Sequence, residues 1–299
     1  MLKETLRPVW AEINLKAIEH NINEIVKKVG DTEIIGVVKA DGYGHGAIEV
    51  SKVLLDNGAS SLAVATLSEA IDLRNAGFKC PIIMLGLTPS IYHQVLIDYD
   101  ITPVLASYME TRILSTLAVE AKKTVEILLA VETGMGRIGF MPNKDSITEI
   151  SGMIQLPNIK IKGIFSHFAT ADEEDKTYSN RQIEIFNNFY KELQDIGIPI
   201  SFRTLANSAA IIELPESYFD AVRPGIILYG CYPSDQVDRS KINLIPAMTL
   251  KANIVFLKRV PKGYPISYGR KFVTERESLI ATLPLGYADG YPRYLSGKG

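Results

Sequence analysis

Eight short runs of apolar and β-branched residues recur along most of the 299-residue chain. Most of them are separated by segments with helical spacing, such as 47–58, 66–77 and 175–197. Strands that are apolar on both faces and alternate with amphipathic helices indicate a parallel sheet covered by helices. Eight such units predict an α/β fold with a closed (β/α)8 TIM-type barrel, and a doubly wound open sheet is the alternative. The runs are 33–40, 61–66, 80–86, 100–107, 124–132, 159–167, 199–208 and 220–230.

The pattern changes near residue 235, where apolar and polar residues begin to alternate between Pro and Gly turns. This alternation predicts antiparallel strands, and hence a β-rich domain over 236–299 after a barrel domain over 1–235. Segment 9–15 also resembles a strand, and it is available to pair with the β-rich domain instead of the barrel. Because the chain stops on an open loop, we expect the β-rich domain to be truncated and its pocket incomplete, with weak turnover unless the chain is part of a longer one.

The charge balance favours neither nucleic acid nor membranes as partners. Lys and Arg total 32 against 34 Asp and Glu, a net charge of -2, and no apolar run approaches the roughly 20 residues that span a bilayer. The N-terminus lacks the apolar stretch of a signal peptide. Two cysteines, Cys80 and Cys231, form no metal-binding or disulfide pattern, so we expect a cytoplasmic protein.

Polar side chains gather where the predicted strands end, which is where this fold places its chemistry. Each one alone has an ordinary structural explanation: a surface lysine, a core histidine, an ion-paired arginine. Lys39 is harder to dismiss, because an apolar run and a glycine-rich loop enclose it; we expect a buried amine with a lowered pKa. The four histidines are scattered, so no metal site is predicted. The strand-end residues are Lys39, Leu85, Arg137, His167, Asn207, Ser208, Arg223 and Gly225.

The segment TGMGRIG, residues 133–139, matches the glycine pattern of dinucleotide-binding loops. That pattern should open a helix, but Pro142 interrupts the first turn that would follow. An arginine on a tight glycine loop is better suited to binding a carboxylate, because its two-pronged contact needs a fixed approach.

Seven motifs, in order along nearly the whole chain, resemble the alanine racemase family, which are fold-type III enzymes that use pyridoxal 5'-phosphate. They are VVKADGYGHG, ETGMGRIGF, SHFATAD, ANSAA, VRPGIILYG, ISYG and LPLGYADGYPR. The resemblance implies interconversion of L- and D-alanine in a homodimer whose active sites are shared across the interface, supplying D-alanine for peptidoglycan.

The same resemblance assigns roles to individual residues. Lys39 would form the Schiff base with the cofactor and act as one base, and Tyr268 of the partner subunit would be the opposite base. Arg223 would bond the pyridine nitrogen, and His167 would lie against the ring and link Arg223 toward Tyr268. The phosphate would be held by Tyr43, Ser208, Gly225 and Ile226, and the cofactor pocket would be lined by Leu85 and Asn207. Arg137 would bond the cofactor's phenolic oxygen or the substrate carboxylate, and Tyr287 would lie near the entrance of the site.

These residue types suit the implied chemistry. Inversion at Cα needs two bases on opposite faces, while the cofactor takes up the electron pair. An arginine stays charged, so at the pyridine nitrogen it would keep that nitrogen unprotonated. One departure is Ala130, where the family often has a carbamylated lysine near the arginine of the glycine loop.

Other functions share most of these motifs. Serine or broad-specificity racemases are the nearest alternatives, and a non-catalytic cofactor-binding barrel is another. Decarboxylases on the same barrel pair the pyridine nitrogen with a carboxylate, whereas this chain supplies Arg223.

Overall fold

The computed structural model describes residues 8–298, and the first part of the segment examined for a signal peptide, residues 1–7, lies outside them. The chain divides into two compact units. One is Asn14–Ala247, and the other joins the residues up to Ile13 with those from Met248 onward. In the described range no helix is long and apolar enough to cross a membrane.

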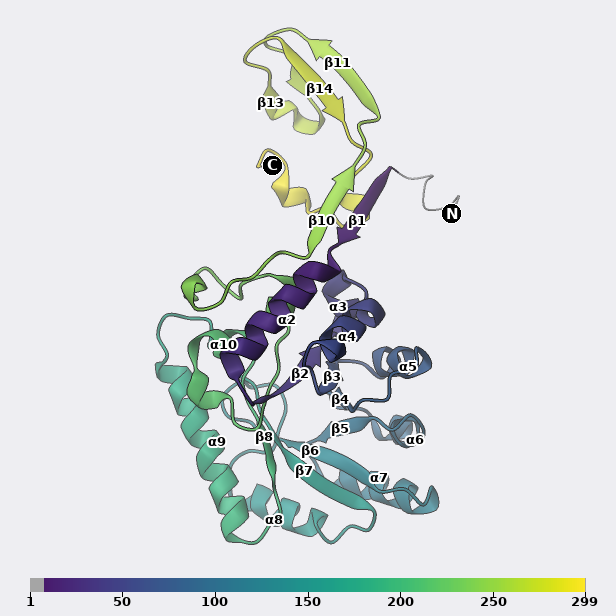
Figure 1. Ribbon diagram of the computed structural model, residues 1–299, viewed down its shortest axis with the longest axis vertical. Helices are drawn as coiled ribbons and strands as arrows, with labels where there is room; N and C mark the ends of the chain where they lie inside the picture. The colour runs from purple at the N-terminus through teal and green to yellow at the C-terminus, as the bar shows by residue number, and fades with distance from the viewer. Residues whose placement is uncertain (1–7, 299) are drawn as a thin grey trace. The chain divides into compact units, whose positions relative to one another are not determined.

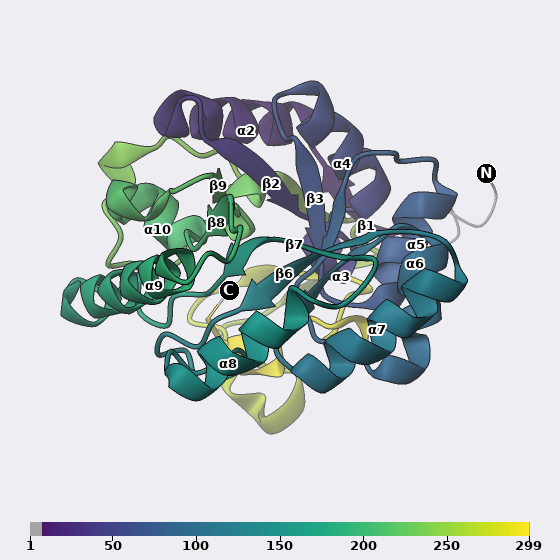
Figure 2. The same ribbon diagram turned by 90° about the horizontal axis from the view of Figure 1, so that it is seen from below.

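The first unit is a closed barrel of parallel strands in sequential order, as the sequence pattern predicts. Figure 2 shows the helices lying outside the strands. Its strands are β2 (Glu33–Val37), β3 (Ser61–Val64), β4 (Ile82–Met84), β5 (Thr102–Leu105), β6 (Val125–Ala130), β7 (Ile159–Phe165), β8 (Phe202–Thr204) and β9 (Ala221–Val222). Its helices are α2 (Leu15–Val29), α3 (Lys39–Gly44), α4 (Ala47–Asp56), α5 (Leu67–Asn75), α6 (His93–Asp98), α7 (Tyr108–Glu120), α8 (Lys144–Met153), α9 (Thr177–Asp195) and α10 (Ser208–Glu213).

Two apolar layers hold the barrel together. The inner layer contains side chains such as Ile35, Val104, Leu128 and Phe165, and the larger outer layer packs the helices onto the strands. Because both faces of every strand are covered, the strands are apolar on both sides, which is the pattern visible in the sequence. Gly163 lets β7 approach β8 closely, since a Cβ there would lie 2.0 Å from the Phe202 carbonyl oxygen.

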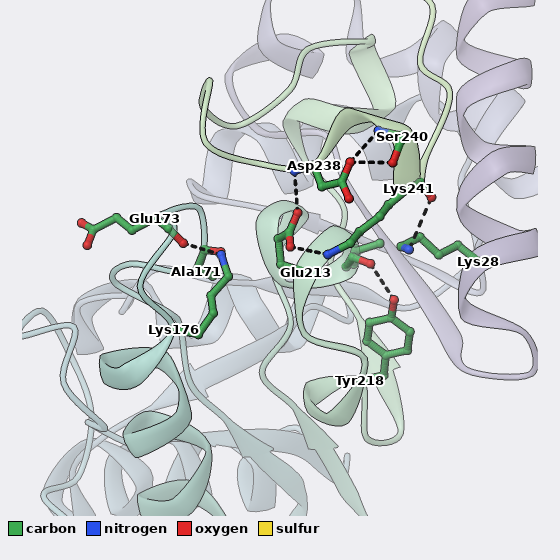
Figure 3. Close-up of polar contacts among 10 residues, drawn as sticks. Lys28, Ala171, Glu173, Lys176, Glu213, Tyr218, Asp238, Ser240 and Lys241 are labelled. Carbon is green, nitrogen blue, oxygen red and sulfur yellow. Dashed lines mark hydrogen bonds and ion pairs between the residues drawn. The ribbon is translucent and has the colours of Figure 1, made fainter.

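The segment that follows the barrel strands is fastened back onto the barrel. Glu213 accepts hydrogen bonds from the Asp238 N–H at 2.7 Å and from Lys241 Nζ at 2.6 Å (Figure 3). The buried Asn21 amide, on α2, donates to the Ile245 carbonyl and accepts from its N–H. These contacts extend the barrel unit to Ala247, beyond residue 235 where the sequence pattern changes.

The second unit consists of antiparallel strand pairs. Strand β1 (Val9–Ile13) pairs with β10 (Met248–Ala252), and the two lie side by side in Figure 1. The other pairs are β11 (Phe256–Val260) with β14 (Ser278–Thr282) and β12 (Pro265–Ile266) with β13 (Phe272–Val273). Among its described residues only Val260 and Thr274 are buried, so this unit has little core of its own.

Candidate active site

Lys39 begins an unusual left-handed turn after β2. Ala40, Asp41, Gly42 and Tyr43 all have positive φ angles, from 52° to 59°. Only the glycine adopts this conformation without steric cost, and each of the other residues pays on the order of 1–3 kcal/mol. Such a turn persists only where the surroundings fix it, so the contacts around it must offset this conformational cost.

Two carboxylates hold this turn. Glu69 accepts the Ala40 N–H at 2.7 Å through one oxygen and the N–H groups of Ala65 and Thr66 through the other. The last contact completes the capping box that Thr66 and Glu69 form at the start of α5. Asp41 Oδ1 accepts the Ala47 N–H at 2.8 Å, at the start of α4. The backbone beside Lys39 is therefore tied to two helices.

The Lys39 side chain is half-buried, with Nζ 5.8 Å from the centre of the Tyr43 ring. The expectation of a buried amine is wrong, because β2 ends at Val37 and the left-handed turn carries the lysine past the covered part of the strand. An amine in this position can reach a molecule bound at the barrel mouth and still exchange protons with it.

A small cradle lies beside the turn, where the loops after β8 and β9 meet. Ser208 Oγ accepts the Gly225 N–H at 2.9 Å. A Cβ on Gly225 would lie 2.8 Å from Tyr43 Oη and 3.7 Å from Ser208 Oγ, so only glycine leaves this space open. Ile226 follows at the start of the 3₁₀ helix η3 (Ile226–Tyr229) and is half-buried. The structure therefore brings together the four residues that the resemblance assigns to a phosphate.

Arg223 is almost completely buried, at 3% exposure. Its guanidinium donates to Thr204 Oγ1 and to the Ser166 carbonyl, each at 2.6 Å, and to the Leu205 carbonyl at 3.1 Å. No Asp or Glu side chain of the described residues forms an ion pair with it. Burial, and then the charge of Arg137, lower the pKa of Arg223 to about 9, which leaves it charged at neutral pH.

His167 lies beside Arg223, with Nδ1 3.4 Å from Nη2. Burial, followed in order of size by the positive charges of Arg223, Arg137 and Lys39, lowers the pKa of His167 to about 3. Since the guanidinium can only donate, the neutral imidazole accepts through Nδ1 and carries its proton on Nε2. Three positive charges around one neutral ring make this mouth suited to an anionic ligand.

The glycine loop after β6 holds a carboxylate of the protein itself. Glu132 accepts the N–H groups of Gly134 and Arg137. Partial burial opposes ionisation, but the N–H groups of four loop residues, starting with Gly136 and Gly134, outweigh it and lower the pKa of Glu132. This loop binds its own carboxylate through backbone N–H groups, and Arg137 is exposed.

The remaining candidates have mixed surroundings. Leu85 is half-buried against the inner layer, and the Asn207 side chain caps α10 by accepting the Ala210 N–H. Ala130 is buried in the inner layer at the end of β6. Tyr268 and Tyr287 belong to the second unit and are 92% and 69% exposed, so this single chain shows neither of them enclosed in a site.

Sequence reasoning missed the side chains that hold the site in place. Glu69, Glu132 and Gln182 each bond backbone groups beside a candidate residue. One signal was available: Gln182 falls on the apolar stripe of its helix, between Ser179 and Ile183, where a polar residue needs a buried partner. Within residues 8–298 no group of three or more His, Cys, Asp or Glu residues is placed so that it could hold a metal ion.

Family models and curated relatives both match this chain to alanine racemases. The alanine racemase N-terminal domain model matches residues 13–233, and the C-terminal domain model matches 247–299. An alanine racemase of Clostridium novyi is 53% identical over 293 residues, which cover 98% of this chain and 76% of that protein.

Solved structures agree with these matches. The alanine racemase of Clostridium difficile 630 has a TM-score of 0.92 at 41% identity, covering 97% of this chain and 76% of that one. A histidine racemase from Leuconostoc mesenteroides has a TM-score of 0.88 at 29% identity, covering 96% and 77%. With a closed barrel, a β-rich second unit and both domain models matched, the chain belongs to the alanine racemase family.

Proposed function

We propose that this chain is a pyridoxal 5'-phosphate-dependent racemase that interconverts L- and D-alanine and supplies D-alanine for peptidoglycan. The proposal includes the cytoplasmic homodimer that the family resemblance implies. The single observation that carries it is the buried Arg223 guanidinium, which touches His167 at the barrel mouth and has no carboxylate partner among the described residues.

The residues present fit this cofactor. A buried positive charge needs hydrogen-bond acceptors around it. The unprotonated pyridine nitrogen of the cofactor is such an acceptor, and Arg223 can donate a hydrogen bond to it. The open space at Gly225, bordered by Tyr43 Oη and Ser208 Oγ, fits a phosphate group. Leu85, Asn207 and Ile226 would line the rest of the pocket, and Lys39 would hold the aldehyde end.

When bound, pyridoxal phosphate supplies an aldehyde that joins amines covalently and a ring that accepts the electron pair left as a Cα–H bond breaks. The residues of this chain do the rest. Lys39 Nζ takes or returns the proton on one face of Cα, and Tyr268 Oη of the partner subunit does so on the other. Arg137 orients the substrate carboxylate, with Tyr287 near the mouth, and Arg223 keeps the ring nitrogen free of a proton because the guanidinium stays charged.

The proposal is tested with the purified chain and pyridoxal phosphate. We expect a visible absorbance band that borohydride abolishes, leaving a covalent label on the Lys39 peptide. We also expect D-alanine to form from L-alanine, with exchange of the α-hydrogen in heavy water. An unlabelled Lys39 at saturating cofactor would refute the covalent assignment.

A Tyr268→Phe variant separates a racemase from a cofactor-binding barrel without catalysis. A racemase keeps the label on Lys39 but loses turnover in at least one direction, whereas a non-catalytic binder is unaffected.

The choice of amino acid forms a separate part of the proposal. The histidine racemase that shares this fold indicates that the barrel alone does not select the side chain. Serine is the nearest rival to alanine, and a kcat/KM for L-serine that equals or exceeds that for L-alanine would replace alanine in the proposal.

A further inference from the structure

Gln182 is a fully buried glutamine on α9, a helix that carries none of the residues assigned above. Each end of its side-chain amide has a hydrogen-bond partner. Oε1 accepts the Ala169 N–H at 3.0 Å, which fixes the orientation of the amide. Nε2 then donates to the His167 carbonyl at 3.0 Å and to Thr133 Oγ1 at 3.1 Å. A buried amide with this many partners specifies one arrangement of the backbone around it.

These contacts join two loops of the barrel mouth. His167 and Ala169 lie in the loop after β7, whereas Thr133 begins the glycine loop that carries Arg137. Thr133 Oγ1 lies 2.8 Å from Ser166 Oγ, and the Ser166 carbonyl accepts from Arg223 at 2.6 Å. A continuous set of hydrogen bonds therefore runs from Gln182 through Thr133 and Ser166 to Arg223.

We propose that Gln182 is a positioning residue that holds the His167 loop against Arg223 and fixes it to the glycine loop. Its effect on racemisation rests on the proposed function, but its effect on His167 does not. No other common side chain of this size accepts one N–H while donating to two oxygens. A glutamate would place an oxygen against the His167 carbonyl, and a methionine would leave the Ala169 N–H and the His167 carbonyl without their Gln182 partner.

His167 reports this arrangement directly, because the chain has only four histidines. Burial is the main reason that the pKa of His167 is low, and the charged groups that act on its ring, Arg223, Arg137 and Lys39, are all positive and lower it as well. If the loop moves, the ring leaves the guanidinium or gains water, and either change raises the pKa of His167.

The experiment follows the histidine rings by nitrogen NMR during an acid titration of the ¹⁵N-histidine-labelled, cofactor-loaded chain. Gln182→Glu and Gln182→Met are compared with wild type. Gln194→Glu, an exposed glutamine on the same helix, is the matched control. We expect both Gln182 variants to raise the His167 midpoint by at least about 1 pH unit. The other histidines and the control should stay at their wild-type midpoints.

Activity gives a second readout, with kcat falling about tenfold in the Gln182 variants and little change in KM, because the substrate contacts remain. The two proposals can fail separately. If the wild-type chain has no racemase activity but the His167 midpoint still shifts in the Gln182 variants, the proposed function is refuted and the positioning role is supported.

Wild-type His167 midpoints in both Gln182 variants would overturn the proposal, as would an equal shift in Gln194→Glu. Should both Gln182 variants fail to fold, Thr133→Val cuts the same hydrogen-bond path with a smaller change of shape. It must also move the His167 signal, and an unmoved signal overturns the proposal.

Discussion

Lys39 and Arg223 both bring a positive charge to the barrel mouth, from the neighbouring strands β2 and β9. The carboxyl ends of these two strands are joined by a backbone hydrogen bond, in which the Val37 N–H donates to the Pro224 carbonyl at 3.0 Å. Their surroundings nevertheless differ. The Lys39 side chain is half-buried, and the fold fixes the backbone next to it. Arg223 is buried, and the fold fixes its side chain directly.

This difference matches what each group is proposed to do. A proton-transfer base must move and change charge, so its backbone is held and its amine is left free. A group that only stabilises charge works best when it does not move, so hydrogen bonds hold the guanidinium on several sides. Substitutions on the two sides should therefore separate activity from stability.

The largest effect should come from Lys39→Ala. If Lys39 is a proton-transfer base, turnover falls by about 10³-fold or more, while the free energy of unfolding changes little because the side chain is half-buried. Steady-state assays and urea unfolding of the same samples measure both quantities. A variant that unfolds more easily but keeps its activity would reverse the contrast.

Arg223→Lys should lower stability strongly, in contrast to Lys39→Ala. A lysine cannot reach Thr204, Ser166 and Leu205 together, and a buried acceptor left unpaired costs about 1–3 kcal/mol. We expect the free energy of unfolding in urea to fall by about 2–3 kcal/mol. Arg203→Lys, on β8 and partly exposed, is the control and should cost less than about 1 kcal/mol. Equal losses in the two variants would show that burial of Arg223 is not what matters.

The pH dependence of stability should reveal the neutral His167. Its pKa in the folded state is about 3, below the value of about 6.5 in an unfolded chain, so the unfolded state binds more protons between these values. As the pH falls through this window, the free energy of unfolding should drop by at most about 1.4 kcal/mol per pH unit from this group.

Replacing His167 with asparagine removes that contribution, because an amide does not titrate. The difference between wild-type and His167→Asn stability, measured by urea unfolding at several pH values, should therefore shrink as the pH falls from 6.5 toward 3. A difference that stays constant across the window would mean that the ring is protonated alike in both states.

Glu69→Gln, which alters the support of the turn at Lys39, should have the smallest effect. One oxygen is replaced by an NH₂ group, so either the Ala40 N–H or the N–H groups of Ala65 and Thr66 lose their acceptor. We expect a loss of about 1 kcal/mol in stability, as for a lost helix cap. Hydrogen exchange should be faster at the Ala40 amide, while Glu49→Gln, exposed on α4, should leave it unchanged.

The sequence by itself determined the barrel and most positions at its mouth. Alternating apolar runs and helical segments have periods that follow from the backbone, so they are readable without knowing which parts of the chain meet. Lys39, His167 and Arg223 are readable in the same way, because each comes after the apolar residues of a predicted strand.

Only the tertiary structure decided how those residues are held. The bond from Gln182 to Thr133 joins residues 49 positions apart, and the bond from Glu69 to Ala40 joins residues 29 apart. The half-burial of Lys39 depends on a left-handed turn that the Glu69 and Asp41 carboxylates stabilise. Such contacts depend on which loops the closed barrel brings side by side, and no periodicity along the chain records that arrangement.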